Sequence, residues 1–236
     1  MNQNVSTIFK QLLSSEKTIH IKLLGDSITH GVGGTGFVQD GEPIVANFAR
    51  NPNGYCWAKL LKDYLESNYD CKVNNNGCTG TRIEFVIEHF DTLVSEEDNL
   101  VICMIGTNNR HQRYDEPPMR TPDEQRSRFY ENIKVLYQKF LDAGKQVIFM
   151  ANIPASEANE QDGAEYKRLI HMVDINALYE KASLEFGFPM VSLYRRFSEY
   201  CDQNKIELDT LLADGLHPND RGYDVMYHLL KKEFGV

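Results

Sequence analysis

Short apolar runs alternate with longer segments of helical periodicity along almost the whole chain. Five such runs, each bounded by turn-forming residues, predict buried strands. They are His20–Leu24, Cys71–Asn75, Leu100–Ile105, Gln146–Ala151 and Pro189–Leu193. Apolar residues also recur at helical spacing within residues 57–65, 129–140, 169–177 and 223–234. This alternation predicts parallel strands joined by right-handed helical crossovers.

The predicted strands are apolar almost throughout, rather than at every second position. Such strands fit a sheet that helices cover on both faces. The chain has 236 residues and shows no repeat, low-complexity tract or linker, so we expect one domain over residues 1–236. The expected fold class is therefore α/β, with three layers and a doubly wound sheet of five parallel strands.

Several helix boundaries are marked by capping residues. Thr121-Pro122-Asp123-Glu124 is a capping box with proline at the first helical position, and Gly144 is placed to end that helix. Asn219 or Asp220 is expected to cap the last helix. Within Met1–Lys17, apolar residues at helical spacing predict an amphipathic helix that packs on the domain rather than a secretory segment.

Composition and charge narrow the classes of partner. A net charge of -9 argues against nucleic acid and anionic membranes as main partners. No apolar run approaches ~18 residues, so we expect no membrane insertion. The five cysteines are odd in number and none has C-x-x-C spacing, which indicates free thiols in a reducing compartment. We therefore expect a cytoplasmic protein.

Candidate site residues follow the ends of three predicted strands. Ser27 follows the first strand in Gly25-Asp26-Ser27, Gly77 follows the second, and Asn108 follows the third. Because the carboxyl ends of parallel strands meet at one edge of a sheet, where open α/β sheets bind ligands, we expect these residues to lie close together. Ser27 by itself is also a good candidate for a helix N-cap.

Asp214 and His217, near the C-terminus, supply what a serine nucleophile needs. The pKa of histidine suits a general base near neutral pH, and a carboxylate on its Nδ1 holds the ring in one tautomer. Asp214 precedes His217 by three residues across an Asp-Gly turn, so its carboxylate can fold back onto the ring. The backbone N–H groups of Ser27 and Gly77 and the side-chain amide of Asn108 are candidate oxyanion donors.

Four blocks of this sequence resemble the signature blocks of the SGNH (GDSL-type) hydrolases. They are Gly25-Asp26-Ser27-Ile28-Thr29, Gly77, Gly106-x-Asn108 and Asp214-x-x-His217, in the family's order. The resemblance implies a flavodoxin-like fold and serine esterase chemistry without a metal or organic cofactor. It makes Ser27 the nucleophile, His217 the base and Asp214 its orienting acid, with Ser27, Gly77 and Asn108 as the oxyanion hole. Two departures, Ile28 in the first block and Asn109 in the third, remove no reacting atom.

The substrate is indicated less directly. Arg110, Arg113 and Tyr114 directly follow the Asn108 block, and such a charged run is either a solvated face or a contact for a polar ester. Asp26 is included among the candidate substrate contacts, although we expect it to brace the turn. The long segment Gly31–Asn53 has mixed polarity, unlike the apolar lid of a long-chain lipase.

These features favour an esterase that removes a short acyl group, such as acetyl, from a carbohydrate or another polar alcohol through a covalent acyl-Ser27 intermediate. An O-acyltransferase that uses the same residues with a sugar hydroxyl as acceptor stays open. A non-catalytic carbohydrate-binding protein on the same fold is a further alternative. The sequence indicates no oligomeric state.

Overall fold

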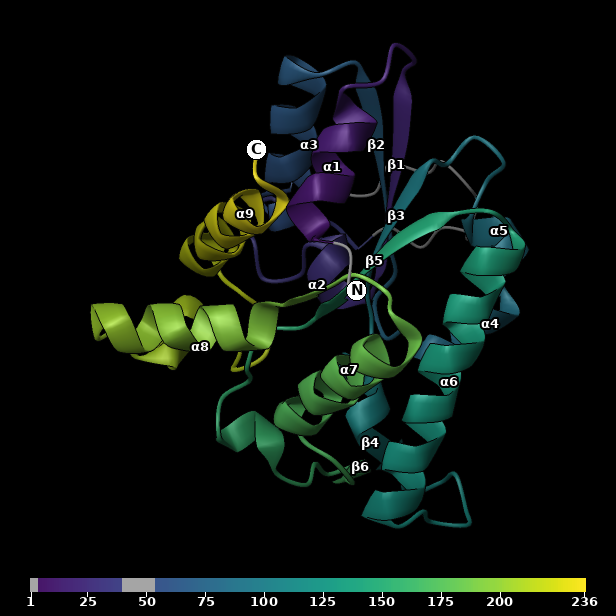
Figure 1. Ribbon diagram of the computed structural model, residues 1–236. Coiled ribbons are helices and arrows are strands. Elements are labelled where there is room, and N and C mark those ends of the chain that lie inside the picture. The colour runs from purple at the N-terminus through teal and green to yellow at the C-terminus, as the bar shows by residue number, and fades with distance from the viewer. Residues whose placement is uncertain (1–3, 40–53) are drawn as a thin grey trace.

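The computed structural model describes residues 4–39 and 54–236. Its centre is a five-stranded sheet in the order β2-β1-β3-β5-β7, in which every pair is parallel (Figure 1). The strands are β1 (Ile19–Gly25), β2 (Cys71–Gly77), β3 (Leu100–Met104), β5 (Gln146–Ala151) and β7 (Met190–Ser192). The expected doubly wound sheet of five parallel strands is confirmed.

Helices cover both faces of the sheet. One face carries α1 (Val5–Leu13), α3 (Trp57–Asn68), α8 (Leu193–Asn204) and α9 (Asp220–Phe234). The other carries α4 (Ile83–Glu88), α5 (Phe90–Leu93), α6 (Pro122–Asp142) and α7 (Met172–Phe186). Figure 1 shows α1, α3 and α9 on the opposite side of the sheet from α4, α5 and α6. The molecule therefore has the expected three α/β/α layers.

Each layer of helices packs on its own apolar core. Because successive side chains of a strand point to opposite faces, Ile102 of β3 joins the first core while Cys103 joins the second. In the first core, the ring of Phe9 in α1 stacks on Phe234 in α9 with centroids 4.4 Å apart. The predicted N-terminal amphipathic helix is thus confirmed for the described residues, and residues 1–3 lie outside them.

The capping signals are also confirmed. The Thr121 Oγ1 accepts the Glu124 N–H at 3.2 Å, and the Glu124 Oε2 accepts the Thr121 N–H at 2.7 Å. Gly144 follows the end of α6 with a φ of 65°, and the side chain of Asn219 caps α9.

The predicted last strand was too long, because Leu193 instead begins α8. Helices α4, α5 and α8 were not predicted from the sequence pattern.

A second, two-stranded antiparallel sheet lies beyond the carboxyl edge of the main sheet (Figure 1). It pairs β4 (His111–Arg113) with β6 (Tyr166–Arg168), and the sequence analysis did not predict it. Short 3₁₀ turns, η1 (Thr107–Arg110), η2 (Ala158–Glu160) and η3 (Leu208–Leu211), occupy the connections. No helix in the described ranges is both long and apolar enough to cross a membrane.

Candidate functional site

A sharp turn from strand to helix places Ser27 at the carboxyl edge of the sheet. β1 ends at Gly25, where a Cβ would lie 2.5 Å from the Met104 carbonyl oxygen, so only glycine fits this approach. Asp26 then caps the four-residue helix α2 (Ser27–His30), because its Oδ1 accepts the Ile28 N–H at 3.0 Å. Ser27 is the first residue of α2. Its own N–H therefore lies in the first helical turn, where backbone donors lack helical acceptors.

The side chains of Ser27, His217 and Asp214 form one continuous chain of hydrogen bonds. The Ser27 Oγ lies 2.8 Å from the His217 Nε2, and the His217 Nδ1 lies 2.7 Å from the Asp214 Oδ2. The other carboxylate oxygen of Asp214 accepts the backbone N–H of His217 at 2.8 Å. Burial alone would raise the pKa of the Asp214 carboxyl, but its hydrogen bonds with His217 and the charge of His217 outweigh that effect and hold the pKa below its ordinary value.

The turn that carries Asp214 and His217 is fixed from two sides. The Ser156 N–H, in the connection after β5, donates to the Gly215 carbonyl at 2.8 Å. On the other side, the Tyr223 hydroxyl in α9 donates to the Val32 carbonyl at 2.7 Å. That second bond joins α9, which follows His217, to the segment that follows Ser27. It therefore helps to fix the distance between the backbones that carry Ser27 and His217.

Asn108 lies in η1, directly after β3. Its Nδ2 donates to the Thr81 carbonyl at 2.9 Å, which fixes the amide plane and leaves the second N–H of the same nitrogen available. Ser27 follows β1 and Asn108 follows β3, and the order β2-β1-β3 places the topological switch between those two strands. Ligands bind at such a switch in open α/β sheets.

The prediction for Gly77 is wrong. The Gly77 N–H donates to the buried Oδ1 of Asn75 at 2.9 Å, so it is already satisfied within the protein. Three residues later, Gly80 lies in a turn closed by the Thr81 N–H and the Cys78 carbonyl, with a φ of 80° and open space around its Cα. Among the described residues, no acceptor takes the Gly80 N–H. The sequence did not reveal that Gly80, and not Gly77, has a positive φ. The two glycines therefore differ in whether their N–H is already bonded within the described residues.

Two candidate substrate contacts are also corrected. Asp26 is 0% exposed, and its oxygens are occupied by the Ile28 N–H and by the Asn152 Nδ2 at 3.2 Å, so it braces the nucleophile turn. Burial raises the pKa of its carboxyl, and hydrogen bonds from Thr107 and Ile28 oppose that rise. The Asn152 amide also contacts the Thr107 hydroxyl. The sequence analysis missed this support, although Asn152 follows β5 at the same edge.

Arg110 is likewise internal, with only 1% of its surface exposed. Its Nε donates to the Thr107 carbonyl at 3.0 Å, its Nη2 donates to the Asn159 Oδ1 at 3.0 Å, and its Nη1 lies 2.9 Å from the Glu160 carboxylate. Burial, followed by the charge of Arg168, lowers the pKa of its guanidinium to about 10. Arg110 therefore holds η1 and η2 together rather than facing a substrate.

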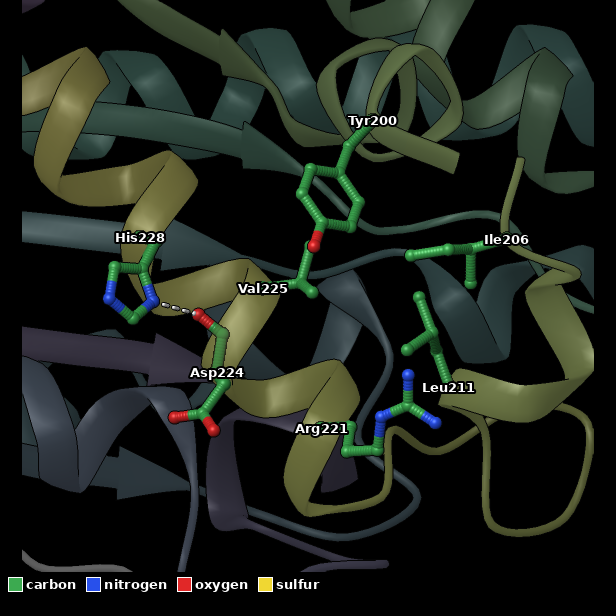
Figure 2. Close-up of a pocket in the computed structure, with 7 residues that line it drawn as sticks. All are labelled: Tyr200, Ile206, Leu211, Arg221, Asp224, Val225 and His228. Carbon is green, nitrogen blue, oxygen red and sulfur yellow. Dashed lines mark hydrogen bonds between the residues drawn. The ribbon is translucent and has the colours of Figure 1, made fainter. Parts of the chain in front are cut away.

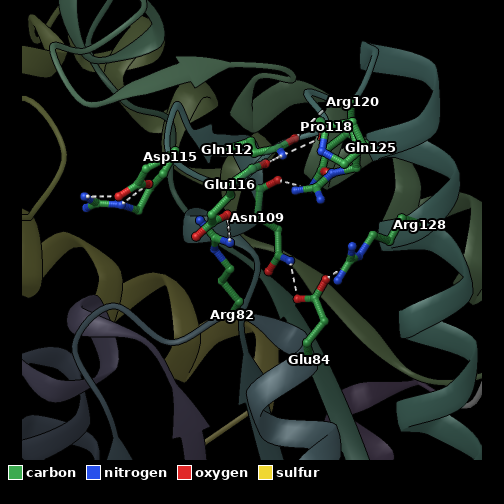
Figure 3. Close-up of polar contacts among 11 residues, drawn as sticks. Arg82, Glu84, Asn109, Gln112, Asp115, Glu116, Pro118, Arg120, Gln125 and Arg128 are labelled. Carbon is green, nitrogen blue, oxygen red and sulfur yellow. Dashed lines mark hydrogen bonds and ion pairs between the residues drawn. The ribbon is translucent and has the colours of Figure 1, made fainter.

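Arg113 and Tyr114 stay predictions as substrate contacts. Arg113 is the last residue of β4 and Tyr114 follows it, and Tyr114 is 51% exposed. The Arg113 guanidinium pairs with Asp115 at 3.0 Å and with Glu165 at 3.2 Å. Figure 3 shows the polar contacts that anchor the neighbouring segment, among them Arg82 with Glu116 and Gln112 with the Pro118 carbonyl. In the Gly31–Asn53 segment, residues 40–53 lie outside the described residues.

A hollow of about 320 Å³ lies elsewhere, between the end of α8 and α9. Figure 2 shows its lining, with the Arg221 guanidinium beside Leu211 and with the His228 Nδ1 turned to the Asp224 carbonyl. None of the residues that line it belongs to the Ser27–His217–Asp214 chain. The candidate site is therefore identified by its hydrogen-bonded side chains and not by the volume of a cavity.

The arrangement at Ser27 has the parts that acyl transfer requires. A hydroxyl contacts an imidazole, a carboxylate orients that imidazole, and free N–H groups lie at the same edge of the sheet. The structure joins Ser27, His217 and Asp214 by hydrogen bonds and places Asn108 after β3 at the same edge of the sheet. Within residues 4–39 and 54–236, the unpaired backbone donor is Gly80 rather than Gly77.

Comparisons with known proteins agree with this architecture. The model of the GDSL-like lipase/acylhydrolase family matches residues 23–225. No curated protein matches the chain. Among solved structures, the acetylxylan esterase from Geobacillus stearothermophilus is similar with a TM-score of 0.67 and 19% identity, over 95% of this chain and 97% of that chain.

Two further structures share the fold. An α/β hydrolase enzyme from the metagenome of Lake Arreo, Spain, has a TM-score of 0.66 and 20% identity, over 93% of this chain and 97% of that chain. A two-domain esterase active on acetylated mannans has a TM-score of 0.64 and 16% identity, over 98% of this chain and 52% of that chain. At these identities the likeness shows the fold, which is the three-layer arrangement described above.

Proposed function

The chain belongs to the GDSL-like lipase/acylhydrolase family, and on this premise we propose that it is a serine esterase that removes a short acyl group, such as acetyl, from a carbohydrate or another polar alcohol. Family membership makes it a hydrolase of carboxylic esters. The carbohydrate is supported by the structural neighbours, whose descriptions include an acetylxylan esterase and an esterase active on acetylated mannans. The single observation that carries the mechanism is the hydrogen-bonded chain Ser27–His217–Asp214.

In the proposed acylation step, the Ser27 Oγ attacks the ester carbonyl carbon while the His217 Nε2 takes the hydroxyl proton. The Asp214 carboxylate accepts the Nδ1 hydrogen and stabilises the imidazolium that forms. The tetrahedral intermediate then expels the alcohol, which takes the proton from His217. This leaves the acyl group on Ser27.

The negative charge on the carbonyl oxygen needs donors, and we assign three. They are the N–H of Ser27 at the start of α2, the N–H of Gly80, and the second N–H of the Asn108 amide. In the deacylation step, His217 removes a proton from water, the hydroxide attacks the acyl carbon, and the bond to Ser27 breaks with return of the proton to its Oγ.

The test is hydrolysis of p-nitrophenyl acetate and of acetylated sugars by the purified protein. Ser27→Ala is expected to lower kcat by about 10⁴-fold or more while the circular dichroism spectrum stays that of the wild type. His217→Ala is expected to lose about as much, because the members of a triad act as a unit. Ser198→Ala is the matched control, since its hydroxyl bonds only within α8.

A Ser27→Ala variant that keeps the wild-type rate would refute the nucleophile. Labelling by a fluorophosphonate probe adds a readout that does not depend on the choice of ester. The wild type is expected to be labelled at Ser27, and the absence of labelling would instead favour a non-catalytic protein on the same fold.

A further inference from the structure

Asn109, which departs from the third signature block of the family, is buried beside the oxyanion residue Asn108. It is 1% exposed and directly follows Asn108 in η1. Its N–H donates to the Gly106 carbonyl at 2.9 Å, and its carbonyl accepts the side-chain amide of Gln125 in α6. Because almost none of its surface is exposed, Asn109 can act only through the protein groups that it contacts.

The side chain of Asn109 holds the start of α4. Its Oδ1 accepts the Ile83 N–H at 3.0 Å, and its Nδ2 donates to the Glu84 Oε2 at 2.7 Å. Ile83 is the first residue of α4, where backbone donors lack helical acceptors. Arg82, at the N-cap position, supplies no side-chain capping bond within the described residues. Asn109 therefore provides the cap that the residue before the helix does not.

Glu84 is fixed from a second side by α6. Its other carboxylate oxygen, Oε1, accepts the Arg128 Nε at 2.9 Å (Figure 3). The amide of Asn109 and the guanidinium of Arg128 thus occupy the two oxygens of one carboxylate. The bond between positions 109 and 84 therefore has a defined polarity, in which the amide donates and the carboxylate accepts.

The segment that Asn109 holds also carries the anchor of the Asn108 amide. The Asn108 Nδ2 donates to the Thr81 carbonyl at 2.9 Å, two residues before the start of α4. The Thr81 N–H in turn closes the turn that contains Gly80. Two consecutive side chains of η1 therefore hold one short stretch, residues 81–84, which anchors one proposed oxyanion donor and borders another.

The position of these donors matters most in the transition state. An oxyanion donor acts at about 2.7–3.1 Å from the place that the charged oxygen takes, and loss of one donor costs about 10²–10³ in kcat. A donor that is displaced rather than removed should cost less, about tenfold. Because the full charge is absent from the bound ester, such a displacement lowers kcat and leaves KM nearly unchanged.

We propose that Asn109 is a positioning residue for the oxyanion hole. Its side chain fixes the start of α4 through Ile83 and Glu84, which places the Thr81 carbonyl and so aims the Asn108 amide. This inference rests on the proposed esterase function. Asn109 itself touches no reacting atom, and its contribution to the rate is made through Asn108.

A reversal of polarity tests the bond between positions 109 and 84. Asn109→Asp keeps an acceptor for the Ile83 N–H but sets a second carboxylate against Glu84, and two carboxylates in contact do not both stay ionised in place. We expect kcat on p-nitrophenyl acetate to fall by about tenfold, with KM within about twofold of the wild type. Adding Glu84→Gln should restore most of kcat, because the new amide donates to the new carboxylate and still offers an oxygen to Arg128.

A second pair of variants tests whether Asn109 acts through Asn108. In an Asn108→Ala background the amide is already gone, so Asn109→Asp should lower the remaining kcat by less than about threefold. Arg126→Gln is the matched control, because Arg126 pairs with Asp174 at 3.0 Å and so joins α6 to α7 in the same layer of helices. This control should keep the kcat and KM of the wild type.

A fallback covers a variant that does not fold. If circular dichroism shows that Asn109→Asp is unfolded, Glu84→Ala replaces it, since the Glu84 side chain is 30% exposed and its truncation leaves no buried charge. Glu84→Ala should lower kcat by about threefold or more without a matching change in KM, and an unchanged kcat would overturn the positioning role.

Failure of this role is distinguishable from failure of the esterase. Three results overturn the role while leaving the hydrolase intact: a folded Asn109→Asp variant with the wild-type kcat, a loss that Glu84→Gln does not restore, or an equal loss in the Asn108→Ala background. Wild-type protein that neither hydrolyses p-nitrophenyl acetate nor is labelled at Ser27 by fluorophosphonate refutes the proposed function, and the role of Asn109 with it.

Discussion

Replacing Arg110 with methionine separates a structural role from a substrate-binding role for the charged run after Asn108. The guanidinium is 1% exposed and contacts the Thr107 carbonyl, the Asn159 side chain and the Glu160 carboxylate. Methionine fills much of the same volume and removes all three contacts. The expected result is a large loss of stability, because Glu160 then stays partly buried without its cation.

The magnitude follows from what Glu160 retains. Breaking a buried ion pair by removing one partner costs about 3–5 kcal/mol. Glu160 keeps the Met172 N–H at 3.0 Å and the His171 Nδ1 at 3.1 Å, and its side chain is 17% exposed, so we expect the lower end of that range. At about 2–4 °C per kcal/mol for a chain of this size, about 3 kcal/mol lowers Tm by roughly 6–12 °C.

Thermal and urea unfolding by circular dichroism measure the loss, and initial rates on an acetylated sugar at 20 °C give KM. We expect KM to change by less than about twofold, because the guanidinium does not reach the substrate. The double variant Arg110→Met/Glu160→Gln should recover about 1 kcal/mol or more, since it removes the unpaired charge. A Tm within 2 °C of the wild type together with a KM raised tenfold would refute this reasoning and restore Arg110 as a substrate contact.

Two further predictions concern the glycines at positions 77 and 80 and the half-buried ring of His111, where burial and the charges of neighbouring arginines lower the pKa of the imidazole. Gly77→Ala should destabilise the protein more than Gly80→Ala, because a Cβ at 77 would lie 2.4 Å from the His30 backbone nitrogen, while at 80 only the left-handed φ costs about 1–2 kcal/mol. Melting temperatures of the pair check this, and the reverse order would contradict the packing argument. His111 has a pKa of about 3 in the folded protein against 6.5 in the unfolded chain, so between these values the unfolded chain binds more protons and stability falls as the pH falls. His111→Gln should therefore lose less stability than the wild type between pH 7 and pH 4.5 in urea titrations, and an equal loss would mean that the ring is not held neutral.

The doubly wound sheet and the positions of Ser27 and Asn108 at its edge were predictable from local patterns, whereas Asp214 and His217 were assigned from the chemistry of a serine nucleophile and from the family resemblance. A strand that is covered on both faces tends to be apolar at consecutive positions, and β3 and β5 leave such continuous runs in the sequence, whereas β2 at the edge of the sheet does not. The chain turns at the end of each run, which is why Ser27 and Asn108 could be assigned to one edge. The strand at Pro189–Leu193 was predicted too long, because the apolar Leu193 suits the end of a buried strand as well as the first turn of α8.

The backbone conformation after β2 was not predictable in the same way. Gly77 is the last residue of β2 and Gly80 follows it, and composition alone cannot say which N–H is free. In the structure the Gly77 N–H donates to Asn75, while the Gly80 N–H has no acceptor among the described residues, because the chain turns at Cys78–Thr81 with a positive φ at Gly80. A hydrogen bond between a backbone and a side chain two residues away depends on dihedral angles that a sequence pattern does not specify.

Hydrophobic periodicity is a local property, so the pattern of the chain was enough to place Ser27 and Asn108 at one edge of a parallel sheet. Asp214 and His217 were assigned by the chemistry that a serine nucleophile needs and by the family resemblance. Which of the charged residues are buried depends on contacts between distant segments. Arg110 and Arg168 look alike in the sequence, but Arg110 is 1% exposed and pairs with the Glu160 carboxylate, whereas Arg168 lies on the two-stranded sheet and donates to the Asn159 carbonyl. That difference arises from pairing between segments about 55 residues apart, since β4 meets β6 only after the chain has crossed α6 and β5.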